Sequence, residues 1–349
     1  MSSKINQIQN EISELKSLVD KRITTAEDKF SRFLANGMET KSLYDEGESQ
    51  ESSDFVHYIR TGEVKNENIM EFKSKRGSFE GGIPVSSASN NLISFNLEKL
   101  SVLRRLSKVQ MISSDSFDLI VEENGGKATW GTPSVKEPFV KKYIKTYELV
   151  AEPKATSKLI EDIRIDVEQY MSEKIAQSFA IAEDEAFLLG NGIEMPNGLL
   201  NIPNGKSTES IEQLEANLTA DSIIQLIGML NSFYSGNTAF LMSHETENLI
   251  KSLKDASGRH LWLSRSGEIE QNSILGIPVF VSNFMPKPES GKIAIFYGNF
   301  EKGYKIIEKF GNYMMRDPYT ERPFIKFYTS KKVGGDLVDG NAIKSLKII

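Results

Sequence analysis

The apolar positions at the start of the chain repeat at alternating spacings of three and four. Polar and charged residues lie between them, and the stripe consists of Ile5, Ile8, Ile12, Leu15 and Val19. This heptad-like pattern is typical of a helix that packs against another helix. It predicts one long helix to about Leu34. An ordinary amphipathic helix can carry the same stripe, so the pattern leaves both that interpretation and a coiled coil open.

Two polar stretches follow this helix. Residues 39–54 are rich in Asp, Glu, Ser, Gly and Gln, which predicts a solvated linker. A short amphipathic helix is expected at Phe55–Arg60, ending at Gly62. The second stretch, Lys73–Gly82, combines Gly, Ser and basic residues, and such segments are exposed, flexible and open to proteases. We therefore expect a domain boundary near residue 75.

The middle of the chain predicts an arm and then a long two-stranded excursion. Apolar residues between 90 and 109 indicate an arm that contains a short helix. Alternating residues at 116–122 and 140–150 predict two strands, and Gly125, Gly126 and Pro133 indicate a turn-rich tip around Trp130. An isolated two-stranded ribbon is marginal in water, so this excursion needs a surface to lie on.

The strongest helical pattern covers Leu159–Leu189 and ends at Gly190 and Gly192. At 1.5 Å per residue this helix would be about 45 Å long. Thr219 and Ser243 are expected to cap two further helices. Strands without regular βαβ alternation predict an α+β fold. The strand candidates are 239–242, 274–281, 292–297, 304–310, 324–328 and 342–349.

Composition narrows the class of protein. Hydrophobic residues make up 39% of the 349 residues, which is enough for a real core, and no apolar run approaches the length of a membrane helix. The absence of cysteine excludes disulfides and thiolate metal sites. A net charge of −6 argues against a protein that grips DNA through its phosphates. The polar N-terminus lacks a secretory signal, so we expect a cytosolic product.

No catalytic pattern emerges from the titratable residues. His57, His244 and His260 are scattered, without carboxylates at metal-ligand spacing. Phosphate-binding loops and nucleophile elbows are absent from the sequence. Adjacent carboxylates such as Glu122–Glu123 and Asp184–Glu185 are interpreted as solvated surface charge. We therefore expect no enzyme, no cofactor and no metal.

Several strings, in this order, resemble the Hong Kong 97-type major capsid proteins of tailed bacteriophages and gene-transfer agents. The resemblance covers residues 80–349. Trp130–Pro133 stands where the family has its extended loop. The other strings are Phe187–Gly192 with Pro196–Leu200, Leu253–Trp262 with Ile274–Val279, Ile295–Phe300, Tyr304, Arg316–Thr320 and Lys332–Gly335.

The resemblance implies the parts of a Hong Kong 97-like capsid fold. These are a helical, coiled-coil-like scaffolding prodomain with its linker, an N-terminal arm, an extended β-hairpin loop, a peripheral domain with a long spine helix, and an axial domain. Their expected ranges are 1–75 for the prodomain, 76–112 for the arm, 113–152 for the loop, 153–218 with 308–332 for the peripheral domain, and 219–307 with 333–349 for the axial domain.

The resemblance also implies a function. Copies of the chain would form pentamers and hexamers of an icosahedral head around double-stranded DNA, without sequence-specific binding and without a membrane. A portal protein and a maturation protease are the implied partners, in the virion capsid and in the host bacterial cytoplasm during assembly. The protease would remove the prodomain within Lys73, Ser74, Lys75, Arg76 and Gly77, just before Gly81–Val85.

Two further expectations concern contacts between subunits. Trp130 is a candidate anchor on a neighbouring subunit, with local packing inside the loop as the alternative. Some family members join a loop lysine to an asparagine of another subunit with the help of a glutamate. Lys127, Lys136, Lys141 and Lys142 are available here, but Phe324–Val333 contains neither Asn nor Glu. We therefore predict no such crosslink.

Three other classes of protein stay open at this point. An encapsulin-like compartment would share the fold but enclose protein cargo, and the long N-terminal helix argues against it. An α+β enzyme would need a site that the sequence does not display. A coiled-coil adaptor is compatible with residues 1–34 alone. The sequence does not distinguish a phage from a prophage remnant or a gene-transfer agent.

Overall fold

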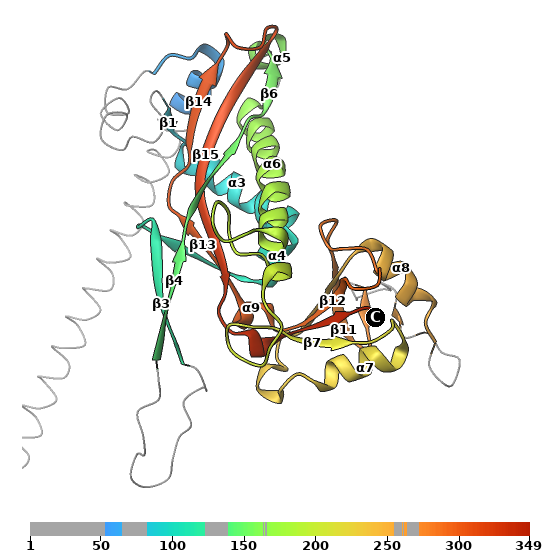
Figure 1. Cartoon of the computed structure of the whole chain (residues 1–349). Helices are drawn as coiled ribbons and strands as arrows, with labels where there is room; N and C mark the ends of the chain where they lie inside the picture. Colours follow the sequence, from blue (N-terminus) through green and yellow to red (C-terminus); the bar gives the residue numbers. More distant parts are fainter. Residues whose placement is uncertain are drawn as a thin grey trace, which may run out of the picture.

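Two mixed sheets organise the chain in the computed structural model, which describes residues 53–64, 82–122, 139–162, 164, 166–254, 260, 262–263 and 272–349. Helices and strands follow one another without regular βαβ alternation, which confirms the predicted α+β class. Figure 1 shows an elongated part built on the first sheet, here called the long body, and a smaller lobe built on the second sheet.

The sheet of the long body has seven strands in the order β1-β14-β15-β13-β2, with β5 and β6 also paired to β15. The central strand β15 runs along the length of this part (Figure 1). Strand β2 pairs with β13 in parallel, and the other pairs are antiparallel. The strands are β1 (Ile83–Pro84), β2 (Lys108–Ile112), β5 (Tyr147–Ala151), β6 (Lys154–Thr156), β13 (Tyr304–Lys309), β14 (Tyr313–Asp317) and β15 (Phe324–Leu337).

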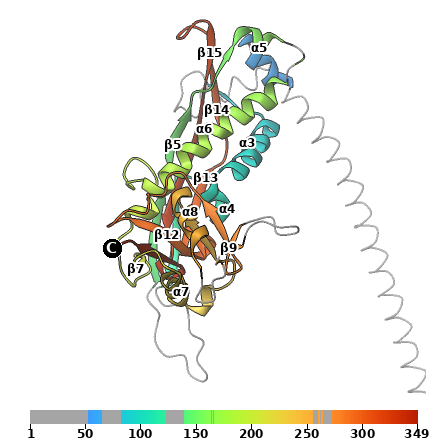
Figure 2. The same ribbon diagram turned by 90° about the vertical axis from the view of Figure 1, so that its right-hand side faces the viewer.

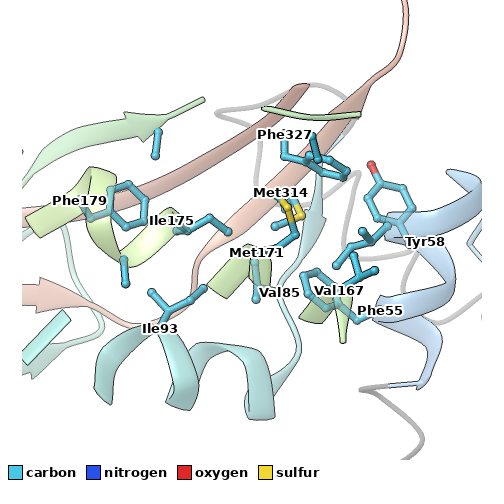
Figure 3. Close-up of a cluster of buried hydrophobic side chains, with 14 of the residues drawn as sticks. Phe55, Tyr58, Val85, Ile93, Val167, Met171, Ile175, Phe179, Met314 and Phe327 are labelled. Atoms are coloured by element: carbon cyan, nitrogen blue, oxygen red, sulfur yellow. The ribbon is translucent and has the colours of Figure 1, made fainter. Parts of the chain in front are cut away.

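Helices α3 (Ser87–Leu100) and α6 (Val167–Leu189) lie side by side along the long body in both views (Figures 1 and 2). The short helices α4 (Val102–Leu106) and α5 (Ser157–Glu161) lie near their ends, and residues 53–61 form a further helix. Apolar side chains from α3, α6, β14 and β15 meet in one core cluster, part of which is drawn in Figure 3.

The lobe is built on a second sheet with the order β7-β16-β12-β8-β11-β10-β9. Its strand β8 is buried along all four residues, and α7 and α8 supply the apolar side chains that complete a separate core. The elements are β7 (Glu212–Glu215), α7 (Ala220–Gly228), β8 (Ala239–Met242), α8 (His244–Ser252), β9 (Trp262–Leu263), β10 (Ser273–Ile274), β11 (Ile277–Val281), β12 (Ile293–Gly298) and β16 (Ile343–Lys347).

Long body and lobe are joined by a third apolar cluster. Phe187 and Tyr304 pack edge to face there, and Phe296 and Ile343 reach the same cluster from the lobe sheet. The short helix α9 (Phe300–Gly303) and the 3-10 turns η1 (Leu199–Asn201), η2 (Ser232–Tyr234) and η3 (Gly340–Ala342) complete the described elements outside the hairpin of β3 and β4.

The predicted helix over Leu159–Leu189 is wrong at its start, because the chain forms two helices there. Thr156 caps α5 and Asp166 caps α6, each accepting a hydrogen bond from a backbone amide. Between them, the Asp162 carboxylate accepts a hydrogen bond from the Arg164 backbone amide, which favours a turn. The spine helix therefore has 23 residues and is about 35 Å long.

Strand pairing decides which sheet each of three segments joins. Strand β7 pairs with β16 and so belongs to the sheet of the lobe. Residues 304–307 and 333–337 belong to the sheet of the long body, because β13 and β15 form one antiparallel ladder from Tyr304–Leu337 to Glu308–Val333. The expected ranges of the peripheral and axial domains stay a prediction.

The predicted helix caps are confirmed in detail. The Thr219 hydroxyl accepts a hydrogen bond from the Ser222 amide, and the Ser243 hydroxyl accepts one from the Thr246 amide. Gly190 ends α6 with an extended backbone, where a Cβ would lie 2.0 Å from the Pro196 carbonyl oxygen. Glycine is thus required there by the close approach of the following loop.

Candidate functional site: a projecting hairpin and the buried charges beneath it

Strands β3 (Ser116–Glu122) and β4 (Phe139–Lys145) form an antiparallel hairpin that extends away from the long body (Figure 1). Among the described residues these two strands pair only with each other. The prediction of two paired strands is therefore confirmed for 116–122 and 140–145, whereas residues 147–150 of the predicted second strand belong to β5 and pair with β15. An exposed ribbon of this kind gains little stability alone and is suited to contact another surface.

The base of the hairpin is anchored to the long body by apolar and charged contacts. Ile144 packs with Ile112 and Ile307 in a small buried cluster. The Asp115 carboxylate lies 2.6 Å from the Lys309 Nζ and 3.0 Å from the Lys332 Nζ. Hydrogen bonds from these two ammonium groups lower the pKa of Asp115, although its side chain is largely exposed.

A glycine in β15 allows the hairpin base to approach closely. A Cβ on Gly334 would lie 2.2 Å from the Lys145 carbonyl oxygen, so no other residue fits without moving the strands. Lys142 forms an ion pair of 3.5 Å with Asp336 on the same strand β15. The direction in which the hairpin leaves the body is therefore fixed at its base.

Farther out, the hairpin carries exposed groups. Tyr143 is 60% exposed, and Lys141 forms a surface ion pair with Asp118. Trp130, the predicted anchor, lies outside the described residues, as do Lys127 and Lys136. The predicted cleavage region, Lys73 to Gly77, also lies outside them.

Beneath the hairpin, four charged side chains form a buried network between α4, α6, β13 and β15. The Arg104 guanidinium contacts Glu183 at 2.5 Å and Glu308 at 2.6 Å. The Lys331 Nζ lies 2.5 Å from Glu183 and 3.2 Å from Glu308. All four side chains are at most 6% exposed. Two positive and two negative charges therefore neutralise each other inside the body.

The network shifts the pKa values of two of its members, Glu308 and Arg104. Burial alone raises the pKa of Glu308, but the charges of Lys331 and Arg104 and their hydrogen bonds outweigh burial and lower it to about 2. Burial lowers the pKa of Arg104, and the charges of Glu183 and Glu308 more than reverse this effect. Glu308 and Arg104 are thus both charged at neutral pH, and the ion pairs of the network join α6 to strands β13 and β15.

The position of Asp184 contradicts the prediction that Asp184 is a solvated surface charge. Its carboxylate is buried and accepts hydrogen bonds from the Ser101 hydroxyl at 2.6 Å, the Val102 amide at 3.0 Å and the Leu103 amide at 3.2 Å. It therefore caps α4 from the neighbouring helix α6. Burial raises the pKa of Asp184, and these hydrogen bonds oppose that rise. Glu185 is exposed as expected.

The described residues provide no metal site, since no three His, Asp or Glu side chains among them gather closely enough to hold an ion. His244 instead pairs with Glu247 on its own helix at 3.0 Å. Within the same part of the chain, no helix has the length and apolar character to cross a membrane.

Known proteins resemble this arrangement in sequence and in fold. The model of the phage capsid family matches residues 81–348. The major capsid protein of Escherichia phage T5 is 24% identical over 220 residues, which are 57% of this chain and 48% of that protein. The chain thus aligns with about half the length of this relative.

Solved capsid structures extend the comparison. The capsid of a native GTA (gene transfer agent) particle is 31% identical, with 70% of this chain and 89% of that chain covered at a TM-score of 0.59. A chain from Microbacterium phage Oxtober96 is 12% identical and shares the fold, covering 71% of this chain and 91% of its own at a TM-score of 0.51. The chain belongs to the phage capsid family, whose members are structural proteins of phage or gene-transfer-agent capsids and not enzymes.

Proposed function

We propose that this chain is the shell-forming major capsid protein of a tailed phage or gene-transfer agent. In this proposal its copies assemble into pentamers and hexamers of an icosahedral head that encloses double-stranded DNA. The observation that carries the proposal is the family match over residues 81–348 together with the projecting hairpin. Such a hairpin gains a supporting surface when it lies across a neighbouring subunit.

The charge of the chain is compatible with an enclosing wall. A net charge of −6 leaves no general attraction for phosphates, so packaged DNA would not be held tightly against the shell. Binding of DNA would be indirect and independent of its sequence. Assembly would take place in the host bacterial cytoplasm, around a portal protein that gives the DNA its entry.

The segment 1–75 is proposed to act as a scaffolding prodomain. The heptad-like stripe over the first residues supports association between helices, and the family match begins at residue 81, after this segment. A maturation protease would cut within Lys73 to Gly77. Mature particles whose capsid chain still begins at Met1 would contradict this part of the proposal.

Expression of the full chain and of residues 76–349 tests the proposal. Size exclusion and negative-stain electron microscopy should reveal closed shells or rings of five and six subunits. Because many modest contacts act together in a shell, assembly should rise steeply with subunit concentration. Monomers of both chains at every accessible concentration would contradict a shell-forming role.

A further inference from the structure

The helix at residues 53–61 lies outside the family match but is packed into the core of the long body. Phe55, Tyr58 and Ile59 are buried and belong to the same apolar cluster as residues of α6, β14 and β15. In Figure 3, Phe55 and Tyr58 point from this helix into the cluster. The spacing of these three residues places them on one face of the helix.

The long body offers this helix a matched apolar surface. We call it the helix seat and define it by Val85, Val167, Met314 and Phe327, which belong to the same cluster, together with Arg316. These residues come from four separate parts of the chain, all within the range that matches the family. The seat is therefore a property of the capsid domain, whereas its occupant comes from the preceding segment.

Arg316 recognises the end of the helix. Its Nε donates to the Ile59 carbonyl at 3.1 Å, and its terminal NH2 group donates to the Arg60 carbonyl at 3.4 Å. Its backbone amide donates to the Tyr58 hydroxyl at 3.1 Å. The last carbonyls of a helix lack partners of their own and carry negative partial charge, so a guanidinium is suited to bind them.

The return contact comes from the helix itself. The Arg60 guanidinium donates to the Ile160 carbonyl at 3.1 Å, which is one of the free carbonyls near the end of α5. Gly62 then ends the helix with a φ of +83°, and its amide donates to the Tyr58 carbonyl at 2.8 Å. Apolar burial and polar contacts at both ends thus define one position for the helix.

A helix this short is unstable in isolation, so the strength of its attachment depends on how it is connected. In the intact chain the helix and the seat are parts of one molecule, and for covalently linked groups effective concentrations on the order of 1 mM are typical. After a cut between them the helix would have to bind as a separate molecule. At micromolar subunit concentration, binding of the separate helix through the same contacts would cost far more translational and rotational entropy.

We propose that residues 53–61 form a latch that stays in the helix seat while the chain is intact and leaves it once the chain is cut between residues 64 and 82. The inference rests on the proposed removal of the N-terminal segment. Cleavage would then do more than discard a scaffold, since it would uncover an apolar surface on the long body. That surface would become available to the rearranged body or to a second copy.

An introduced cut tests the latch without any phage protease. A recognition sequence for a site-specific protease is placed between Val64 and Gly82 of the full chain, and unassembled subunits are isolated by size exclusion. Hydrogen exchange of the amides at 56–61 and fluorescence of an apolar dye are measured before and after cutting, at about 1 µM subunit. We expect exchange to become at least tenfold faster and dye fluorescence to rise.

A peptide with residues 53–64 should reverse both changes. The peptide concentration at half-saturation should lie between about 1 µM and about 1 mM. Tighter binding would keep the helix in its seat after the cut, and weaker binding would not keep it there in the intact chain. The Ile59→Ala peptide should bind about 30-fold more weakly. Arg316→Gln in the body should weaken the peptide about tenfold, whereas Arg322→Gln, at an exposed position on the same segment, should not.

Two results would overturn the latch. If the amides at 56–61 stay protected in the cut chain at about 1 µM, the helix is a permanent part of the core. If the cut loosens the whole body and the peptide does not restore it, the seat is not a separate binding surface. Neither result bears on shell formation, because the subunits are unassembled throughout.

Discussion

Replacement of Arg104 by methionine tests the role of the buried charge network. Methionine retains much of the buried apolar stem but removes the guanidinium that contacts Glu183 and Glu308. Only Lys331 would then oppose two buried carboxylates, which leaves one uncompensated negative charge in the core. The variant should therefore be strongly destabilised.

The expected size follows from the geometry of the network. Breaking one partner of a fully buried ion pair destabilises a protein by about 3–5 kcal/mol. In a domain of this size about 1 kcal/mol corresponds to roughly 2 °C, so the melting temperature should fall by about 6–10 °C. Arg105→Met is the matched control, because this neighbouring arginine is exposed and has no carboxylate partner among the described contacts.

A double-mutant cycle separates charge from packing. Glu308→Gln alone leaves an excess positive charge, whereas Arg104→Met with Glu308→Gln leaves the neutral pair of Lys331 and Glu183. The double variant should therefore be less destabilised than the sum of the single variants by about 1–3 kcal/mol. Differential scanning calorimetry on unassembled subunits measures all four proteins. Additive losses, or equal losses for Arg104→Met and Arg105→Met, would refute the reasoning.

Four further predictions follow from the same structure. The pKa of Glu308 is lowered to about 2, so its contribution to stability is complete above the unfolded value of 4.5, and the free energy of unfolding should fall by about 3 kcal/mol as the pH falls from about 5 to 2. The Glu308→Gln variant should lose less stability over this pH range, and an equal loss would contradict the prediction. Gly334→Ala should lower the melting temperature by several degrees and speed hydrogen exchange of the backbone around Lys145, because the added Cβ would collide with the Lys145 carbonyl oxygen. Unchanged exchange there would contradict the close contact between Gly334 and Lys145. Tyr143→Ser should reduce shell assembly about tenfold or more without changing the melting temperature of the subunit, whereas Tyr319→Ser, which changes another exposed tyrosine, should change neither assembly nor melting temperature. Equal assembly by both variants would exclude a subunit contact at Tyr143. Particles boiled in detergent should run as single chains on gels, since Phe324–Val333 lacks Asn and Glu, and covalent ladders would show the opposite.

Much of the lobe and the hairpin could be predicted because local signals determine them. The caps at Thr219 and Ser243, the apolar run at β8 and the alternation of β3 and β4 are short-range patterns, and each corresponds to an observed element. Strand β14 and strand β7 have no clear alternation and were missed. Strand β7 pairs with β16, which lies far away in the chain, whereas β14 pairs with the next strand, β15, across the short connection at 318–323.

The buried network was not predicted, because two of its charged residues stand at positions of a helix and a strand where the periodic pattern expects an apolar residue. Glu183 lies four residues from both Phe179 and Phe187, and all three are buried on α6. Lys331 lies between the inward-facing Thr329 and Val333 on β15. Each charge viewed alone indicates a solvent-exposed position, and only the fold brings them together. A charged residue in register with an apolar stripe was the available signal.

The break between α5 and α6 shows how tertiary contacts override a local pattern. The apolar spacing continues through the break, but the carbonyls near the end of α5 are bound by Arg60 from a helix about a hundred residues earlier. No local pattern could reveal that partner. The same distant helix was predicted as a short amphipathic helix at Phe55–Arg60, but its packing into the core of the long body could not be predicted from its own residues.

A cryo-electron microscopy reconstruction of assembled particles tests the central claim most directly. It would show where β3 and β4 lie in the context of other copies of the chain. We predict a closed icosahedral shell of pentamers and hexamers in which the hairpin lies across the neighbouring subunit and Tyr143 is covered. A particle in which the hairpin folds back on its own long body, or a protein that forms no shell at all, would contradict the account.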